Sequence, residues 1–191
     1  QYADSDGDGY GDYPHGQDGD KFPSDPTQWA DSDWDGYGDN QDPGATDSDA
    51  CPSQGGDSTE DRLGCQDTDG EGWSDPGNGE DAHPSGNADA FPNEVTQWRD
   101  TDGDGYGDNA TGTEADDCPG TSGASDQNGT FGCPDSDADG WADTDDAFAD
   151  EATQHADSDG DGFGDNAAGV NGDDCPAAGG NSSVDRQGCI D

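Results

Sequence analysis

Residues 100–108 read Asp-Thr-Asp-Gly-Asp-Gly-Tyr-Gly-Asp, and this stretch determines what kind of protein the chain can form. Acids occupy its positions 1, 3, 5 and 9, a glycine occupies position 6 and an aromatic residue occupies position 7. Five other segments follow the same pattern, with Glu71 replacing Asp at position 5 in one of them. Repetition on this scale indicates a repeat protein in which each segment has the same role.

The six segments provide six sets of candidate metal ligands. Each set consists of the acids at positions 1, 3, 5 and 9 and the backbone carbonyl of the residue at position 7. In the first three segments these residues are Asp4, Asp6, Asp8, Tyr10, Asp12, Asp31, Asp33, Asp35, Tyr37, Asp39, Asp67, Asp69, Glu71, Trp73 and Asp75. In the last three they are Asp100, Asp102, Asp104, Tyr106, Asp108, Asp135, Asp137, Asp139, Trp141, Asp143, Asp157, Asp159, Asp161, Phe163 and Asp165.

Carboxylates at alternate positions of a tight turn can converge on one point, because glycine at position 6 permits the sharp reversal of the chain. Hard oxygen ligands in this number suit Ca²⁺. They fit Mg²⁺ less well, because it keeps its waters, and Zn²⁺ less well, because it prefers His or thiolate. Without an ion, carboxylates about 5 Å apart repel each other by roughly 3 kcal/mol per pair at an effective dielectric of 20. We therefore expect metal binding and folding to be one event.

The segments differ from EF-hands in their surroundings. Their flanks are rich in Gly, Pro, Asn and Asp and lack apolar residues at helical spacing, so no flanking helices are expected. Position 12, where an EF-hand has a bidentate Glu, is acidic in two segments only, at Asp42 and Asp146. We expect the Asp at position 9 to supply the missing carboxylate or to bridge to a second ion. The downstream acids expected to assist are Asp116, Asp117, Asp173 and Asp174.

Two kinds of connector alternate between the segments. One runs from Cys-Pro to Gly-Cys, and its copies are Cys51 to Cys65, Cys118 to Cys133 and Cys175 to Cys189. The other carries a Phe, then Thr-Gln followed by Trp or His, at residues 22–29, 91–98 and 148–155. This alternation divides the chain into a partial repeat 1–30, full repeats 31–99 and 100–156 with two segments each, and a partial repeat 157–191.

The two ends of the chain fall in the middle of a repeat. Gln1-Tyr2 is in register with Gln28-Trp29, and the chain stops at Asp191, where another acidic segment would begin. We therefore expect the chain to be part of a longer repetitive protein.

The composition excludes an ordinary hydrophobic core. Four Lys and Arg face 49 acids, which gives a formal charge of −45, and Leu, Ile, Val and Phe together number 10. This field repels phosphate, so nucleic acid is not an expected partner, and no apolar run approaches a membrane span. Six Ca²⁺ would still leave about −33. We therefore expect more than one ion per segment, with Asp47 and Asp49 among the added ligands.

The segments at 100–108 and 157–165, and the Cys-Pro that follows each acidic pair, resemble the thrombospondin type 3 repeats and their bacterial and archaeal relatives. Six tandem matches extend the resemblance over nearly the whole chain. It implies a chain wound around a row of Ca²⁺ ions in an extracellular protein. The fold class that we expect is therefore irregular and elongated, a calcium ladder with EF-hand-like loops that lack helices, stapled by disulfides.

The six cysteines allow 15 pairings, and metal ligation competes with disulfide formation. No Cys-x-x-Cys occurs and no His lies within a cysteine connector, so zinc is not favoured. The pairs local in sequence are the simplest choice, and each would contribute about 3 kcal/mol by closing a loop of roughly 15 residues. Stable disulfides would place the protein outside the cytoplasm, extracellular or at the cell surface.

Aromatic rings are expected to pack, because aliphatic residues are scarce. Trp29, Trp98 and His155 are expected to pack one acidic segment on the next. Candidate glycosylation sequons begin at Asn109, Asn128 and Asn181.

Catalysis is not expected, because a catalytic centre is one place and the chain has six similar places. Two functions remain. The first is an extracellular calcium-binding structural role, as a stalk, an adhesin segment or a filament subunit that joins copies of itself. The alternative is a calcium-dependent module that recognises a receptor, a glycan or a surface. This alternative predicts one exposed aromatic or basic cluster unlike the rest, which the sequence alone does not single out. A calcium sensor is disfavoured, since no Met-rich groove is present.

Overall fold

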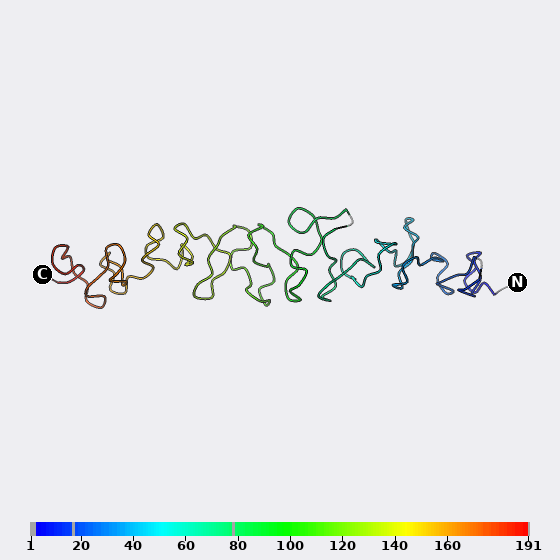
Figure 1. Ribbon diagram of the computed structural model, residues 1–191, viewed down its shortest axis with the longest axis horizontal. Coiled ribbons are helices and arrows are strands. Elements are labelled where there is room, and N and C mark those ends of the chain that lie inside the picture. Colours follow the sequence, from blue (N-terminus) through cyan, green and yellow to red (C-terminus); the bar gives the residue numbers. More distant parts are fainter. Residues whose placement is uncertain (1–2, 17, 78, 191) are drawn as a thin grey trace. The chain divides into compact units, whose positions relative to one another are not determined.

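A computed structural model describes residues 3–16, 18–77 and 79–190. Within these ranges the chain has no helix and no strand, and it therefore has no helix that could cross a membrane. Pairing is limited to isolated bridges, such as Gly38 with Ser48. Figure 1 accordingly shows a succession of loops without coils or arrows. The expected irregular chain without flanking helices is confirmed for these residues.

The chain divides into two compact units, Gln1–Arg99 and Asp100–Asp191. The first unit contains loop 1 (4–12), loop 2 (31–39) and loop 3 (67–75), and the second contains loop 4 (100–108), loop 5 (135–143) and loop 6 (157–165). The expected register of the chain ends rests on Gln1, Tyr2 and Asp191, which lie outside the described residues.

The acidic loops share one backbone conformation. The glycine at position 6 has a φ between 91° at Gly162 and 106° at Gly72, a left-handed value that only glycine adopts at no cost. The position-1 carboxylate holds this turn. In loop 4, Asp100 accepts the N–H of Gly103 at 2.6 Å and of Gly105 at 3.0 Å, and the other five loops repeat the pair of bonds. The sharp reversal expected at position 6 is confirmed.

A second clamp closes each loop between positions 2 and 9. In loop 2, Asp39 accepts the backbone N–H of Ser32 at 3.0 Å and its hydroxyl at 2.6 Å. Position 2 is Ser or Thr in every loop, and all six loops have this pair of bonds. The backbone N–H of Asp39 also donates to the Ala30 carbonyl, so the loop closes on the residue that precedes it.

The segment that joins loops 1 and 2 is held by a buried glutamine. Gln28 is 1% exposed, and its amide donates to the carbonyls of Asn40 at 3.0 Å and Thr46 at 2.7 Å. Its Oε1 accepts the N–H of Asn40 at 3.0 Å. Gln154 makes the corresponding bonds between loops 5 and 6. A polar side chain thus fills the place that an aliphatic residue takes in an ordinary core.

The cysteine connectors are closed by the disulfides that the sequence favours, Cys51–Cys65, Cys118–Cys133 and Cys175–Cys189. The first connector joins loop 2 to loop 3. Its Gly56 N–H donates to Asp35 at 3.1 Å, and its Thr59 and Glu60 N–H groups donate to the Gly72 carbonyl at 2.8 and 2.9 Å. The second connector joins loops 4 and 5 in the same way. Three disulfides are typical of a protein from an oxidising, extracellular environment.

The buried interior is polar. Among the described residues, the largest fully buried side chains are glutamines and aspartates, and the buried apolar residues are four half-cystines with Ala88 and Ala142. Several aromatic rings pack in pairs, of which three stack nearly parallel: Tyr10 with Trp29, Trp73 with Trp98 and Trp141 with His155. Trp29, Trp98 and His155 each stack on the position-7 ring of the loop that precedes them, and their expected packing of one loop on the next stays a prediction.

The buried glutamine gives a first prediction. Replacing Gln28 by Ala leaves the N–H and carbonyl of Asn40 and the carbonyl of Thr46 without their partner, so we expect a loss of about 1–3 kcal/mol of stability. Denaturant unfolding in calcium measures this loss. Gln66→Ala, at an exposed glutamine, is the control and should change stability by less than about 0.5 kcal/mol. Equal effects of the two variants would contradict the role given to Gln28.

Candidate metal centres

Acidic side chains converge in the loops. The residues at positions 1, 3 and 5 each offer an oxygen atom, and these atoms lie within 4.8 Å of one another in each of loops 1 to 5. In loop 6, burial and the charges of Asp161 and Asp173 raise the pKa of Asp159. Because like charges at this separation repel strongly, such clusters could hold a metal ion.

The position-3 carboxylates carry most of the buried, unpartnered oxygens of positions 1, 3 and 5. Both oxygens of Asp33, Asp69, Asp102 and Asp159 are buried without a hydrogen-bond partner, as is one oxygen of Asp6 and of Asp137. A buried carboxylate oxygen without a partner is costly, and native structures rarely retain one. A cation between the carboxylates would remove this cost.

A further aspartate completes each cluster, and we call it the closing aspartate. The closing aspartates of loops 1 to 6 are Asp20, Asp49, Asp89, Asp116, Asp146 and Asp173. One oxygen of each accepts, at 2.6–2.7 Å, the backbone N–H two residues later, which belongs to a Phe or a Cys. In loops 2 to 6 the other oxygen is buried without a partner. The free oxygens are therefore available as ligands.

The backbone carries the closing aspartate back to its loop. In loop 5 it stands at position 12, as in an EF-hand, but in the other loops extra residues intervene. In loops 1, 2, 4 and 6 an isolated β-bridge spans these extra residues. It pairs position 8 with the residue before the closing aspartate. The N–H of Asp49 then donates to the Gly38 carbonyl at 2.8 Å, and the N–H of Asp89 donates to the Ser74 carbonyl at 2.9 Å. The insertions therefore leave the closing position intact.

The pKa values reflect this crowding. Burial, reinforced by the charges of Asp35 and Asp33, raises the pKa of Asp49 to about 6. Burial likewise raises the pKa of Asp116 to about 6 and of Asp89 to about 7. Burial and the charge of Asp89 raise the pKa of Glu71 further, to about 8. Asp49, Asp89 and Asp116 thus respond to the carboxylates of their own loops.

The cysteine connectors cover the clusters that precede them. A side-chain carbon on Gly64 would lie 2.5 Å from Asp49 Oδ1 and 2.9 Å from Asp35 Oδ2, and Gly64 has a left-handed φ of 74°. The connector backbone therefore lies directly on the position-5 and closing carboxylates of loop 2, and glycine is required there. Gly132 and Gly188 occupy the same place over loops 4 and 6.

The structure brings some of the ligands predicted from the sequence together and leaves others exposed. The acids at positions 1, 3 and 5 come together, and Asp116, Asp146 and Asp173 occupy closing positions, as does Asp49. The aspartates that are instead exposed are Asp42, Asp47, Asp117 and Asp174. Sequence reasoning missed Asp20 and Asp89. The signal that could have found them is the repeated Asp-x-Phe or Asp-x-Cys, followed by Pro in five of six copies.

Positions 7 and 9, both expected to supply metal ligands, differ in whether their oxygen atoms are free of hydrogen bonds. Among the described residues, no hydrogen bond reaches a position-7 carbonyl, so these oxygens are available to an ion. Both oxygens of each position-9 aspartate instead accept bonds from position 2, which gives that side chain a role in closing the loop. Direct ligation or bridging by position 9 stays a prediction.

No protein-family model matches the chain, and no curated protein matches it significantly. The resemblance to thrombospondin type 3 repeats therefore stays a prediction. The functional argument rests on the residues and their geometry.

The raised pKa values predict how the metal-free chain responds to pH. The pKa values of Glu71 and Asp89 are higher in the folded chain than the ordinary values of about 4.5 and 3.8 that hold in the unfolded chain. Their contribution to stability is therefore complete below about pH 4 and lost as pH rises through 7 and 8. Near-ultraviolet circular dichroism of the Trp73–Trp98 stack in calcium-free buffer should weaken from pH 4.5 to 8.5. Glu71→Gln should move the loss to lower pH. A signal that strengthens with pH would contradict the assignment.

Proposed function

We propose that the chain is an extracellular calcium-binding structural protein, in which Ca²⁺ ions replace a hydrophobic core. The supporting observation is the recurrence, loop after loop, of buried carboxylate oxygens that have no hydrogen-bond partner. A cation bound at each loop would offset the cost of burying these unpartnered oxygens. In this proposal about half of the 49 acids that give the formal charge of −45 are calcium ligands.

Calcium is the ion that these groups suit best. The position-1, position-3 and position-5 carboxylates, the position-7 carbonyl and the closing aspartate together offer five oxygen-bearing groups per loop. Ca²⁺ takes six to eight oxygens in flexible geometry, so bidentate carboxylates or waters would complete its shell. Mg²⁺ prefers fewer protein ligands, and Zn²⁺ prefers nitrogen or sulfur. We infer six or more ions per chain.

The proposed role is mechanical rather than catalytic. Short hydrogen-bonded links and disulfide-closed connectors join neighbouring loops, so an ion that orders one loop also fixes the residues that contact the next. The same arrangement occurs at every loop and singles out no catalytic centre. We propose an elongated calcium ladder like that of the thrombospondin type 3 repeats, serving as a stalk, an adhesin segment or a filament subunit.

Glycosylation belongs to the same extracellular proposal. Asn128 and Asn181 are exposed, so both are open to modification, and Asn128 lies within the second disulfide-closed connector. Asn109 is half-buried, and its side chain accepts the N–H and hydroxyl of Thr111. We therefore expect glycans at Asn128 and Asn181 before Asn109.

Two adjacent aspartates test the closing position. Asp116 is 6% exposed with a free buried oxygen, whereas Asp117 is exposed. We expect Asp116→Asn to weaken one calcium site at least tenfold and Asp117→Asn to leave all sites unchanged. Isothermal titration with Ca²⁺ and native mass spectrometry measure affinity and ion count. Equal loss in both variants would argue against a dedicated closing aspartate, and fewer than six ions on the wild-type chain would argue against one site per loop.

Removal of calcium tests the structural role. Without ions the clustered carboxylates repel, so we expect the chain to expand and lose order in excess chelator. Small-angle X-ray scattering measures this as an increase in the radius of gyration that added Ca²⁺ reverses. Added Mg²⁺ at the same concentration is the control and should restore less order. An unchanged radius in chelator would contradict the calcium scaffold.

A further inference from the structure

Trp34 departs from the pattern that the loops share. It stands at position 4 of loop 2, where the other loops have glycine or Ala138. The backbone here is left-handed in every loop, with φ of 74° at Trp34 and 82° at Gly103. A bulky residue is unfavourable in this conformation, and Trp34 is 65% exposed, so little burial offsets the strain. Folding alone therefore does not account for a tryptophan at this position.

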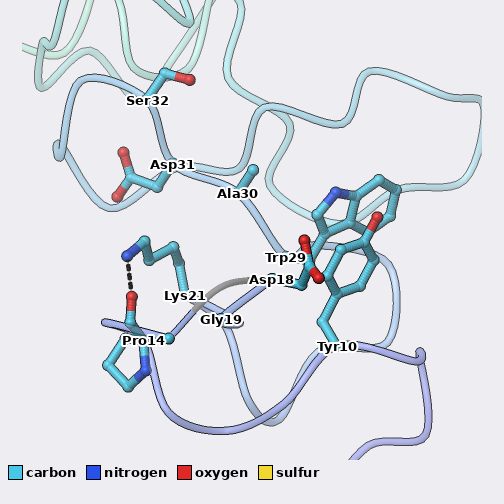
Figure 2. Close-up of a pocket in the computed structure, with 10 residues that line it drawn as sticks. Tyr10, Pro14, Asp18, Gly19, Lys21, Trp29, Ala30, Asp31 and Ser32 are labelled. Atoms are coloured by element: carbon cyan, nitrogen blue, oxygen red, sulfur yellow. Dashed lines mark hydrogen bonds between the residues drawn. The ribbon is translucent and has the colours of Figure 1, made fainter.

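An open pocket of about 330 Å³ lies near this tryptophan within the first unit, although Trp34 itself is not part of its lining. Figure 2 shows the stacked rings of Tyr10 and Trp29 on one side of the pocket and Lys21 with Asp31 on the other. Lys21 connects the pocket to Trp34, because its Nζ lies 4.3 Å from the centre of the Trp34 ring. Asp31, which also lines the pocket, accepts the backbone N–H of Trp34 at 2.6 Å, the turn bond that all six loops share, so Trp34 belongs to the same loop as this wall.

The charges around the pocket restrict what can bind there. The acidic field of the whole chain disfavours an anionic ligand. Lys21 is the single lysine of the sequence, and its ammonium group, which also donates to the Pro14 carbonyl, faces a lining that contains the carboxylates of Asp18 and Asp31. A neutral ligand with hydroxyl groups avoids the penalty on anions and can use both the donor and the acceptors of this lining. It can accept from the Lys21 ammonium and donate to Asp18, whose side chain belongs to the pocket lining.

The aromatic rings at the pocket favour a ligand that has a flat apolar face. Tyr10 and Trp29 line the pocket, and Trp34 extends the aromatic surface beyond Lys21. A pyranose presents such a face through its C–H groups and hydroxyls around its edge. The pocket volume is at the lower end of the range for small-ligand sites, which suits one sugar ring with further rings extending over Trp34.

We propose that the pocket between loops 1 and 2, together with the exposed Trp34, binds a neutral glycan. Lys21 and Asp18 orient the hydroxyl groups of the ring in the pocket, and Trp34 stacks against the next ring. This second function depends on the proposed calcium role in one respect, because loop 2, which carries Asp31 and Trp34, needs its ion to keep its shape.

The test uses a glycan array printed with neutral and acidic oligosaccharides, probed with the whole chain in millimolar Ca²⁺. We expect neutral glycans to bind and acidic ones not to bind. Isothermal titration with the best-bound neutral oligosaccharide should show at least a tenfold weaker affinity for Trp34→Gly and a weaker affinity for Lys21→Gln. Ala138→Gly, at the same position of loop 5, is the matched control and should bind like the wild type.

Calcium counting by native mass spectrometry separates this proposal from the calcium scaffold. Trp34→Gly should keep every ion, since glycine suits the left-handed backbone at this position. The glycan proposal is overturned if the wild type binds no neutral glycan, prefers acidic glycans, or binds as tightly after Trp34→Gly. It is also overturned if sedimentation shows that Trp34 instead joins two copies of the chain and that Trp34→Gly separates them.

Discussion

The burial of carboxylate oxygens without partners is the constraint on which this structure depends. A chain with a formal charge of −45 and ten large aliphatic or Phe residues cannot fold around apolar burial, and its described interior contains glutamine, aspartate and disulfides instead. Most of these unpartnered oxygens belong to the position-3 carboxylates and to the closing aspartates, so the desolvation cost recurs at the same places in successive loops. A bound cation would convert each of these costs into a set of stabilising contacts, which is why metal binding and folding are proposed as one event.

Hydrogen bonds prepare the loops for this role. The position-1 carboxylate and the position-6 glycine shape the turn, and the clamp between positions 2 and 9 closes it. The closing aspartate is fixed separately, by an N–H two residues later and, in every loop except loop 5, by its own N–H, which donates to the position-8 carbonyl. The position-9 side chain thus serves to close the loop, whereas the closing aspartate both accepts a backbone N–H and presents a free oxygen. Such preorganisation lowers the ordering cost of taking up an ion.

Much of this architecture can be predicted from the sequence, because the loop motif is local. The turn at position 6, the local disulfides, the absence of helices in the described residues and the stacking of Trp29, Trp98 and His155 all follow from short-range patterns. Asp20 and Asp89 were missed because a bridge or a backbone bond, not a fixed spacing, returns them to their loops. The clamp at position 9 was missed because Ser or Thr at position 2 is not informative in the sequence by itself. Its role became visible only when the structure showed that it donates to the position-9 carboxylate. Trp34 emerged only through its exposure and its contact with Lys21.

The most direct test of the central claim is a crystal structure of the calcium-loaded chain with anomalous scattering measured to locate the ions. The account predicts an ion in every loop, with oxygens of the position-3 carboxylate and of the closing aspartate at 2.3–2.6 Å. Loop 2 would show this with Asp33 and Asp49, and loop 3 with Asp69 and Asp89. Loops without ions, or closing aspartates whose second oxygen bonds to protein or water instead of metal, would contradict it.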